Sequence, residues 1–212
     1  PLGIQIADVA GGSLHAVIGI LAAVVERQRS GLGQYIDISM TDCVASLNSM
    51  AASASLAGQT PQAPEQGMLN GASFYDYYET KDGRYFSVGS LEPQFMAGLA
   101  AALELPLLLA KGTSFDPEDR QAVKQALQEK FKSQDFVVWQ QLFKTLDICV
   151  EPVLSLDEAL VSPIAEQRGW VVDVPLSENS EQTEAQLACP IKFSRSQIKY
   201  AFIGQGLGEG KW

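Results

Sequence analysis

Residues 6–20 read IADVAGGSLHAVIGI, so one carboxylate, Asp8, and two glycines stand directly before a strongly apolar stretch. The pattern predicts a helix over 11–30, with Gly12–Ser13 as its N-terminal cap region and Gly31 as its end. The residues that recur at the spacing of one helix face are Leu14, Ile18, Leu21 and Val25. Because the other faces are also apolar, we expect this helix to lie inside a larger protein.

The size and charge of the chain limit its class. At 212 residues it is long enough for one ordinary domain or two small ones. A net charge of −10 argues against a nucleic acid or an anionic membrane as the main partner. The most apolar window, 14–25, covers about a dozen residues, which is too short to span a bilayer. We therefore expect neither a nucleic acid nor a membrane as a partner.

Cysteine usage bears on metals and location. Cys43, Cys149 and Cys189 are widely spaced, and no CxxC or Cys/His pair occurs. No metal site and no disulfide framework is therefore expected. Reduced cysteines and the lack of a charged-then-apolar leader favour a cytoplasmic location, and an organelle signal upstream of residue 1 stays open.

A proline-containing loop divides the chain into two parts. Before it, the alternation in YIDISM predicts a strand at 35–40, and a helix rich in small residues follows at 41–56. Residues 58–67 include Pro61 and Pro64 and predict a loop or linker. This is the one domain boundary that the sequence suggests.

The second part reads as an α+β domain. Its Lys81–Gly83 turn joins two β-prone segments and predicts a hairpin of strands 74–80 and 84–90. Further along, the patterns predict helices at 93–104, 117–131, 135–145 and 156–163, strands at 148–154 and 169–174, and a polar loop at 177–186.

Asp8 has a structural interpretation and a functional one. A carboxylate before two glycines and a helix can simply cap a turn. Alternatively, Gly11 and Gly12 let a ligand approach the backbone, and free N–H groups at the helix start can stabilise an oxyanion. Asp8 would then attack a carbonyl carbon or take a proton next to it. His15, the single histidine, is expected to pack in the core with one hydrogen bond.

Glu92 and the tyrosines near it also allow two interpretations. Glu92 ends a predicted strand just before Pro93, so it is either an anion near a helix start or a second catalytic carboxylate on a rigid strand end. Tyr75, Tyr77 and Tyr78 fit equally well as core or interface aromatics.

Three segments together resemble one family, the family III CoA-transferases, also called CaiB/BaiF. They are ADVAGGSLHAVIGILAAVVERQRSGLGQYIDISMTDCV at 7–44, FYDYYETKDGRYFSVGSLEPQF at 74–95 and DICVEPVLSLDEAL at 147–160. The pieces stand in the family's order and cover most of the chain. The pentapeptide LEPQF, 91–95, is most similar to the α-methylacyl-CoA racemase branch.

The resemblance implies an α/β fold that this chain holds in part. Residues 1–60 would be a helix–strand–helix tail of the large CoA-binding-type domain, 68–200 the small α+β domain, and 201–212 a return segment toward the large domain. The whole enzyme would be an interlocked homodimer.

The resemblance also implies a site and a reaction. Asp8 would be the catalytic carboxylate that acts on an acyl-CoA thioester, and no further cofactor or metal would be needed. Glu92 would hydrogen-bond a catalytic histidine, Gly11 and Gly12 would line the substrate site, and Tyr75 would lie near the acyl pocket. Transferases would use Asp8 as a nucleophile, whereas racemases would use it to exchange the α-proton.

The chain departs from the family pattern in one respect. The racemase histidine lies upstream of the Asp8 segment, in a part that also supplies most CoA contacts, and His15 does not match it. We therefore expect a C-terminal fragment that is inactive and self-associates on its own. Three functions stay open: a 2-methylacyl-CoA racemase, a CoA-transferase with a covalent intermediate on Asp8, and a non-catalytic dimerisation module.

Overall fold

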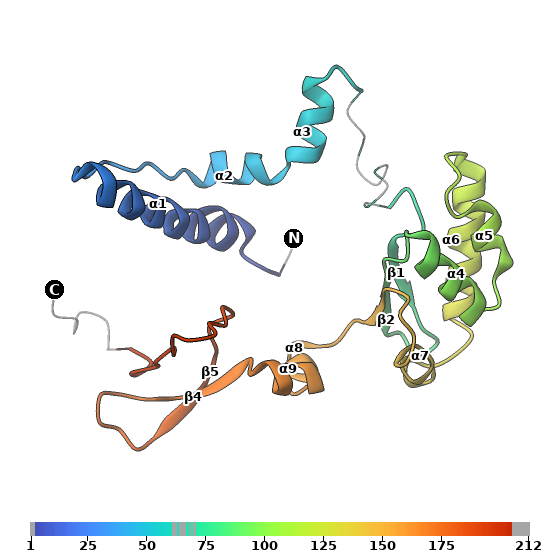
Figure 1. The fold of residues 1–212 in the computed structure, drawn as a ribbon. Coiled ribbons are helices and arrows are strands. Elements are labelled where there is room, and N and C mark those ends of the chain that lie inside the picture. The colour runs from blue at the N-terminus through green and yellow to red at the C-terminus, as the bar shows by residue number, and fades with distance from the viewer. Residues whose placement is uncertain (1–2, 61–62, 64–66, 68, 70, 205–212) are drawn as a thin grey trace. The chain divides into compact units, whose positions relative to one another are not determined.

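The computed structural model describes residues 3–60, 63, 67, 69 and 71–204. The chain forms two compact units, Pro1–Ser73 and Phe74–Trp212, and each is described by itself (Figure 1). Half of the linker predicted at 58–67, including Pro61 and Pro64, and the end of the predicted return segment from 205 on, lie outside the described residues.

The first unit is helical over most of its described length. A π-helix, η1 (Ile6–Ser13), runs into α1 (Leu14–Ser30), and α2 (Met40–Leu47) and α3 (Ser49–Leu56) follow. The expected start at Gly12–Ser13 is wrong, because both residues lie inside one continuous helical segment. Gly31 ends α1 as predicted, with a left-handed φ of 76° and its N–H donated to the Arg27 carbonyl at 2.8 Å.

The predicted strand at 35–40 does not form. Residues 31–39 are neither helix nor strand, and the described part of this unit has no strand for them to pair with. The alternation nevertheless reflects a real contact, because Ile36 and Ile38 both pack against α1 at Gly19. A Cβ atom at Gly19 would lie 3.3 Å from Ile36 Cγ2 and 3.2 Å from Ile38 Cδ1. The alternation of apolar residues therefore correctly indicated which side chains pack against the protein, although the segment is not a strand.

Helix α1 is open on its apolar faces. It contains no buried residue, and the exposed fractions of Leu14, Ile18 and Leu21 are 55%, 61% and 59%. By length and composition alone, the helical segment Ile6–Ser30 could cross a membrane, a test that core helices of soluble proteins also pass. The expectation that this segment is too short is therefore wrong, because the helix begins at Ile6 and has 25 residues.

The second unit contains a three-stranded antiparallel sheet in the order β1-β2-β3. Strands β1 (Asp76–Glu79) and β2 (Tyr85–Val88) form the predicted hairpin, and β3 (Val150–Pro152) pairs with β2. Gly83 adopts the left-handed φ of 79° that its turn requires. Val88 is paired with Asp76 on one side and Val150 on the other, which aligns the three strands at one end.

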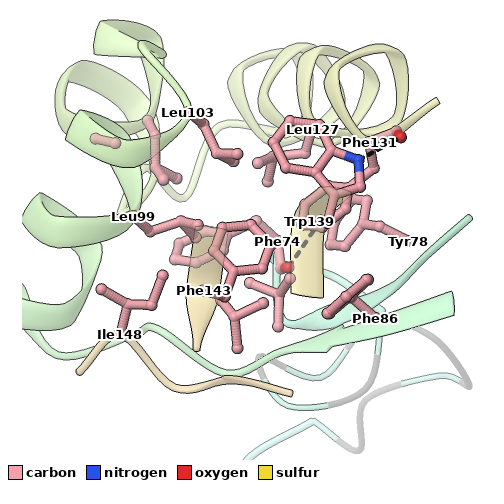
Figure 2. Close-up of a cluster of buried hydrophobic side chains, with 14 of the residues drawn as sticks. Phe74, Tyr78, Phe86, Leu99, Leu103, Leu127, Phe131, Trp139, Phe143 and Ile148 are labelled. Carbon is pink, nitrogen blue, oxygen red and sulfur yellow. Dashed lines mark hydrogen bonds between the residues drawn. The ribbon is translucent and has the colours of Figure 1, made fainter. Parts of the chain in front are cut away.

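Four helices accompany this sheet. They are α4 (Pro93–Ala102), α5 (Pro106–Lys111), α6 (Pro117–Phe131) and α7 (Phe136–Phe143), of which α5 was not predicted. Their apolar side chains and those of the sheet form the core in Figure 2. Phe131 is fully buried there and stacks on Tyr78 with ring centroids 5.3 Å apart. The three tyrosines thus separate: Tyr78 is a core residue, whereas the exposed fractions of Tyr75 and Tyr77 are 39% and 66%.

The hairpin turn caps a distant helix. Asp82 Oδ1 accepts hydrogen bonds from Thr80 Oγ1 at 2.6 Å and from the backbone N–H of Phe136, in the first turn of α7, at 3.0 Å. The residue before α7, Asp135, makes no side-chain cap of its own. Asp82 therefore fixes the hairpin turn to the start of α7.

We predict that Asp82→Asn lowers the thermal midpoint of unfolding at pH 7, and that this difference shrinks as the pH falls below the ordinary carboxyl pKa. The two hydrogen bonds, that of Thr80 first, lower the pKa of the Asp82 carboxyl. A lowered pKa stabilises the fold above the ordinary carboxyl pKa of about 3.9, and this stabilisation is lost as the pH falls through the lowered value. The midpoint difference between the two proteins, followed from pH 7 to pH 3 by circular dichroism, isolates Asp82. A constant difference would contradict the assignment.

The last described elements are two short helices and a hairpin. The single helix predicted at 156–163 is α8 (Leu156–Leu160) and α9 (Pro163–Arg168), each begun by a serine cap. Strands β4 (Val171–Pro175) and β5 (Thr183–Leu187) pair antiparallel. The prediction of a loop at 177–186 is therefore wrong from Thr183 on, where β5 begins. The residues of this strand are polar because both of its faces lie near water, as Thr183 and Glu184 show.

Candidate active site

Asp8 lies at the start of a helix and not before one. It is exposed in the first turn of η1, where backbone N–H groups lack acceptors within the helix and partial positive charge gathers. Its side chain forms no hydrogen bond or ion pair with any described residue. The carboxylate is therefore accessible. The free N–H groups of the helix start, which were expected near Gly11 and Gly12, lie instead in the turn that contains Asp8.

The helix around Asp8 is wider than an α-helix. The N–H of Leu14 is donated to the carbonyl of Val9, five residues earlier. Two side chains also bond carbonyls five residues earlier: Ser13 Oγ donates to Asp8 at 3.0 Å, and His15 Nδ1 to Ala10 at 2.7 Å. Such π-type turns are rare and are frequently found at functional sites. The one hydrogen bond predicted for His15 is confirmed, but its predicted place in the core is wrong, because the ring is only partly buried and α1 contains no buried residue.

Gly11 and Gly12 have a packing role in this structure. Gly11 is the buried residue of η1, and a Cβ atom there would lie 3.0 Å from Val44 Cγ2. A Cβ atom at Gly12 would lie 3.3 Å from Met40 Cγ. Both glycines therefore let α2 approach η1 closely, and their predicted contact with substrate stays a prediction.

We predict that Gly11→Val destabilises the first unit by about 1–3 kcal/mol, because the added isopropyl group overpacks the contact with Val44. Gly33→Val is the matched control, since a Cβ atom at Gly33 would meet nothing within 4 Å. Urea unfolding of both variants measures the difference. Equal stability of the two variants, with substrate binding lost only in Gly11→Val, would assign Gly11 to the ligand and not to packing.

In the second unit, Tyr75 and Glu92 are brought to the same end of the sheet. Tyr75 precedes β1, and a Cβ atom on Gly89, which follows β2, would lie 3.2 Å from Tyr75 Cε2. Gly89 N–H donates to the Cys149 carbonyl at 2.9 Å, and the buried Ser90 Oγ donates to the Ile148 carbonyl. These bonds fix the segment that leads to Glu92.

Glu92 is the residue before α4, with an extended backbone (φ −68°, ψ 141°), and Pro93 begins the helix. Its carbonyl accepts from the N–H of Met96 at 2.9 Å, but its side chain does not cap the helix and is exposed. Glu92 is thus an anion next to a helix start, as one of its two interpretations requires, and this position leaves the catalytic interpretation a prediction. The carboxylate stands on a fixed strand end with its oxygens available.

Cys149 was missed as a neighbour of Glu92. Partial desolvation and the charges of Glu92, Asp147 and Glu151 raise the pKa of the Cys149 thiol, so it stays protonated at neutral pH. A thiolate nucleophile at this end of the sheet is therefore disfavoured. Proximity of segments 58 residues apart, such as Ser90 and Ile148, leaves no local signal in the sequence.

The described residues contain no group of three or more His, Cys, Asp or Glu side chains that could hold a metal ion. Asp8, Gly11 and Gly12 belong to the first unit, and Tyr75 and Glu92 to the second. Of the predicted site residues, the first unit thus holds one exposed carboxylate, Asp8, and the second unit holds the other, Glu92.

The sequence model of CoA-transferase family III matches residues 2–204. The chain belongs to this family. Among solved structures, a CaiB/BaiF family protein from Brucella suis has 25% sequence identity and a TM-score of 0.70, with 99% of this chain and 54% of that chain covered. The α/β fold expected from the resemblance is confirmed, and the chain holds part of the family III fold.

Family III relatives of this chain include proteins named for two reactions. Mouse α-methylacyl-CoA racemase is 40% identical over 159 residues, which are 73% of this chain and 41% of the racemase. Human succinyl-CoA:glutarate CoA-transferase is 26% identical over 177 residues, which are 81% of this chain and 40% of the transferase. The chain spans less than half the length of either relative. It is therefore placed in the superfamily of CoA-transferases and acyl-CoA racemases.

Proposed function

We propose that this chain is part of an enzyme that racemises 2-methylacyl-CoA thioesters by 1,1-proton transfer at the α-carbon. The observation that carries the proposal is the 40% identity with a family III protein named α-methylacyl-CoA racemase, against 26% with a named CoA-transferase. The exposed Asp8 carboxylate in a helix first turn supports it. The acyl-CoA thioester is then the substrate, and we propose no further cofactor or metal.

The thioester makes the chemistry accessible to a carboxylate. A base removes the α-proton, and the electron pair of the broken C–H bond delocalises onto the thioester carbonyl as an enolate. An acid on the opposite face then returns a proton to the α-carbon, which inverts its configuration. Asp8 acts on one face as base or acid, and the positive end of η1 stabilises negative charge beside it.

The second acid/base group is proposed to be a histidine contributed from outside this chain, with Glu92 as its hydrogen-bond partner. The exposed Glu92 side chain, free of a helix-capping bond, supports this role. Tyr75, at the same end of the sheet, is proposed to border the acyl group, and Gly11 and Gly12 the thioester. The working enzyme is proposed to be a cytoplasmic homodimer, in which the apolar faces of α1 are covered.

The nearest alternative is a CoA-transferase, which the 26% identity with the glutarate enzyme favours. Asp8 would attack the thioester carbonyl, CoA thiolate would leave, and an acyl anhydride would form on the Asp8 carboxyl. A non-catalytic dimerisation module is the alternative from another class. In that case, neutralising Asp8 and Glu92 would leave the function of the whole protein unchanged.

The decisive experiment incubates the full-length protein that carries this chain with a 2-methylacyl-CoA in D2O. One sample contains a free carboxylate acceptor, and the other does not. Deuterium at the α-carbon without an acceptor supports the racemase. Transfer of CoA to the acceptor with the α-hydrogen retained, together with a hydroxylamine-sensitive adduct on Asp8, would establish the transferase instead.

A further inference from the structure

A second candidate site in the second unit is lined by residues at the end of α9 and at the end of the β4–β5 hairpin. It is a cavity of about 600 Å³, which is within the usual size range of small-molecule sites. Its lining residues are Arg168, Gly169, Trp170, Leu187, Ala188, Cys189, Pro190 and Lys192. None of them belongs to the candidate active site described above.

The walls of this cavity are held by backbone contacts. The N–H of Ala188 donates to the carbonyl of Trp170 at 2.8 Å, which closes the hairpin beyond its last strand pair. The N–H of Cys189 donates to Tyr200 Oη at 2.9 Å, and the N–H of Ile203 donates to the carbonyl of Pro175 at 2.9 Å, so the segment at 200–203 is bonded to the hairpin and to the residues that follow it. The cavity is therefore bounded by two segments that are fixed to one another.

The chemistry of the lining combines an aromatic surface with positive charge. The indole of Trp170 is 39% exposed, and Leu187 and Pro190 extend the apolar wall. Arg168 and Lys192 carry two positive charges in a chain of net charge −10, and neither forms an ion pair with a described residue. Lys192 Nζ makes one long hydrogen bond, 3.5 Å, to the Gly169 carbonyl.

We propose that this cavity binds a planar organic anion, an aromatic ring that carries one carboxylate or phosphate group. The ring stacks on Trp170, and the anionic group is held by Arg168 and Lys192. Arg168 and Lys192 are both exposed, and two neighbouring cations without an ionic partner among the described residues favour an anion. An exposed indole beside an apolar wall favours a flat ring. The lining residues are not those assigned to the candidate active site, so the proposal does not depend on the racemase reaction.

Isothermal titration of the 212-residue chain tests this site with 2-naphthoate and with adenosine monophosphate. The neutral 2-naphthamide and the ringless acetate are the comparison ligands. We expect saturable binding of at least one ring anion, and the better of the two identifies the carboxylate or the phosphate as the preferred group. 2-Naphthamide and acetate are expected to bind at least about tenfold more weakly.

Variants locate the binding. Arg168→Gln and Lys192→Gln are each expected to weaken it about tenfold, and Trp170→Leu about fivefold. Lys144→Gln and Phe115→Leu are the matched controls, because both residues are exposed and lie outside this cavity. Both controls are expected to bind like the unmodified chain.

Alkylation of Cys189 gives a second measurement that needs no variant. The bound ring anion is expected to slow iodoacetamide modification of Cys189, while Cys43 and Cys149, outside the cavity, react at unchanged rates. Three outcomes would each overturn the proposal: no saturable binding up to about 10 mM, equal binding of naphthoate and naphthamide, or full affinity in all three cavity variants.

Discussion

Asp8→Asn in the full-length protein is expected to reduce deuterium exchange at the α-carbon by about a thousandfold. An amide has nearly the same shape as the carboxylate, but it cannot accept the α-proton, and general acid–base catalysis by one group typically contributes 10²- to 10⁴-fold. The Asp8 side chain is exposed and forms no hydrogen bond or ion pair with a described residue, so its replacement is expected to leave η1 intact. The loss is measured by mass spectrometry of the acyl-CoA after incubation in D2O.

Asp37→Asn is the matched control for this experiment. Asp37 is another exposed carboxylate of the first unit, located between α1 and α2, and it has no assigned role in the reaction. The exchange rate of this variant is expected to stay within about twofold of the unmodified enzyme. If Asp8→Asn exchanged deuterium as fast as Asp37→Asn, Asp8 would not be the acid/base group, and the non-catalytic alternative would gain support.

Local signals were sufficient for much of the second unit. The Asp82-Gly83 pair predicted the β1–β2 hairpin because only a few residue types tolerate its left-handed backbone. Prolines at the first helical position marked the starts of α4 and α6. Each of these signals depends on residues within one turn of the chain, which is why the sequence alone identified them.

The errors occurred where tertiary context decides the structure. Residues 35–40 alternate as a strand does, but they pack on α1 without a strand partner. Thr183–Leu187 is as polar as a loop, yet it forms a strand that pairs with β4. Polar residues are tolerated there because this strand lies at the surface and has no buried face. In both cases, the side-chain pattern indicates which residues are buried. It does not indicate whether a second segment is available to form the backbone hydrogen bonds of a strand.

The candidate site shows the same division. Asp8 and Glu92 were identified by residue type and by position next to a helix start, and both stand exposed in first-turn or N-cap positions. The contact of Tyr75 with Gly89, and the bond from Gly89 to Cys149, depend on strand register. Register is a property of the folded sheet, so the neighbours of Glu92 could not be derived from local sequence.

The largest stability effect is expected from Phe131→Ala, in the core of the second unit. Phe131 is fully buried at the end of α6, and its ring lies 5.3 Å from that of Tyr78, 5.5 Å from Trp139 and 6.0 Å from Phe86. Figure 2 shows these rings gathered in one cluster. Truncation removes the contacts of a whole ring and leaves a cavity, which typically costs about 3–5 kcal/mol.

Phe131→Ala removes the packing of the ring but keeps the hydrogen bond that the Phe131 backbone accepts. Its carbonyl accepts the indole N–H of Trp139 at 2.8 Å, a bond that alanine preserves, so the loss reports the ring alone. Phe115→Ala is the control, because Phe115 is 76% exposed and contacts Arg120 through a cation–π interaction at 5.3 Å. That variant is expected to lose no more than about 1 kcal/mol. Urea unfolding followed by circular dichroism measures both losses, and a Phe131→Ala loss as small as that of the control would mean that the aromatic cluster does not hold the second unit together.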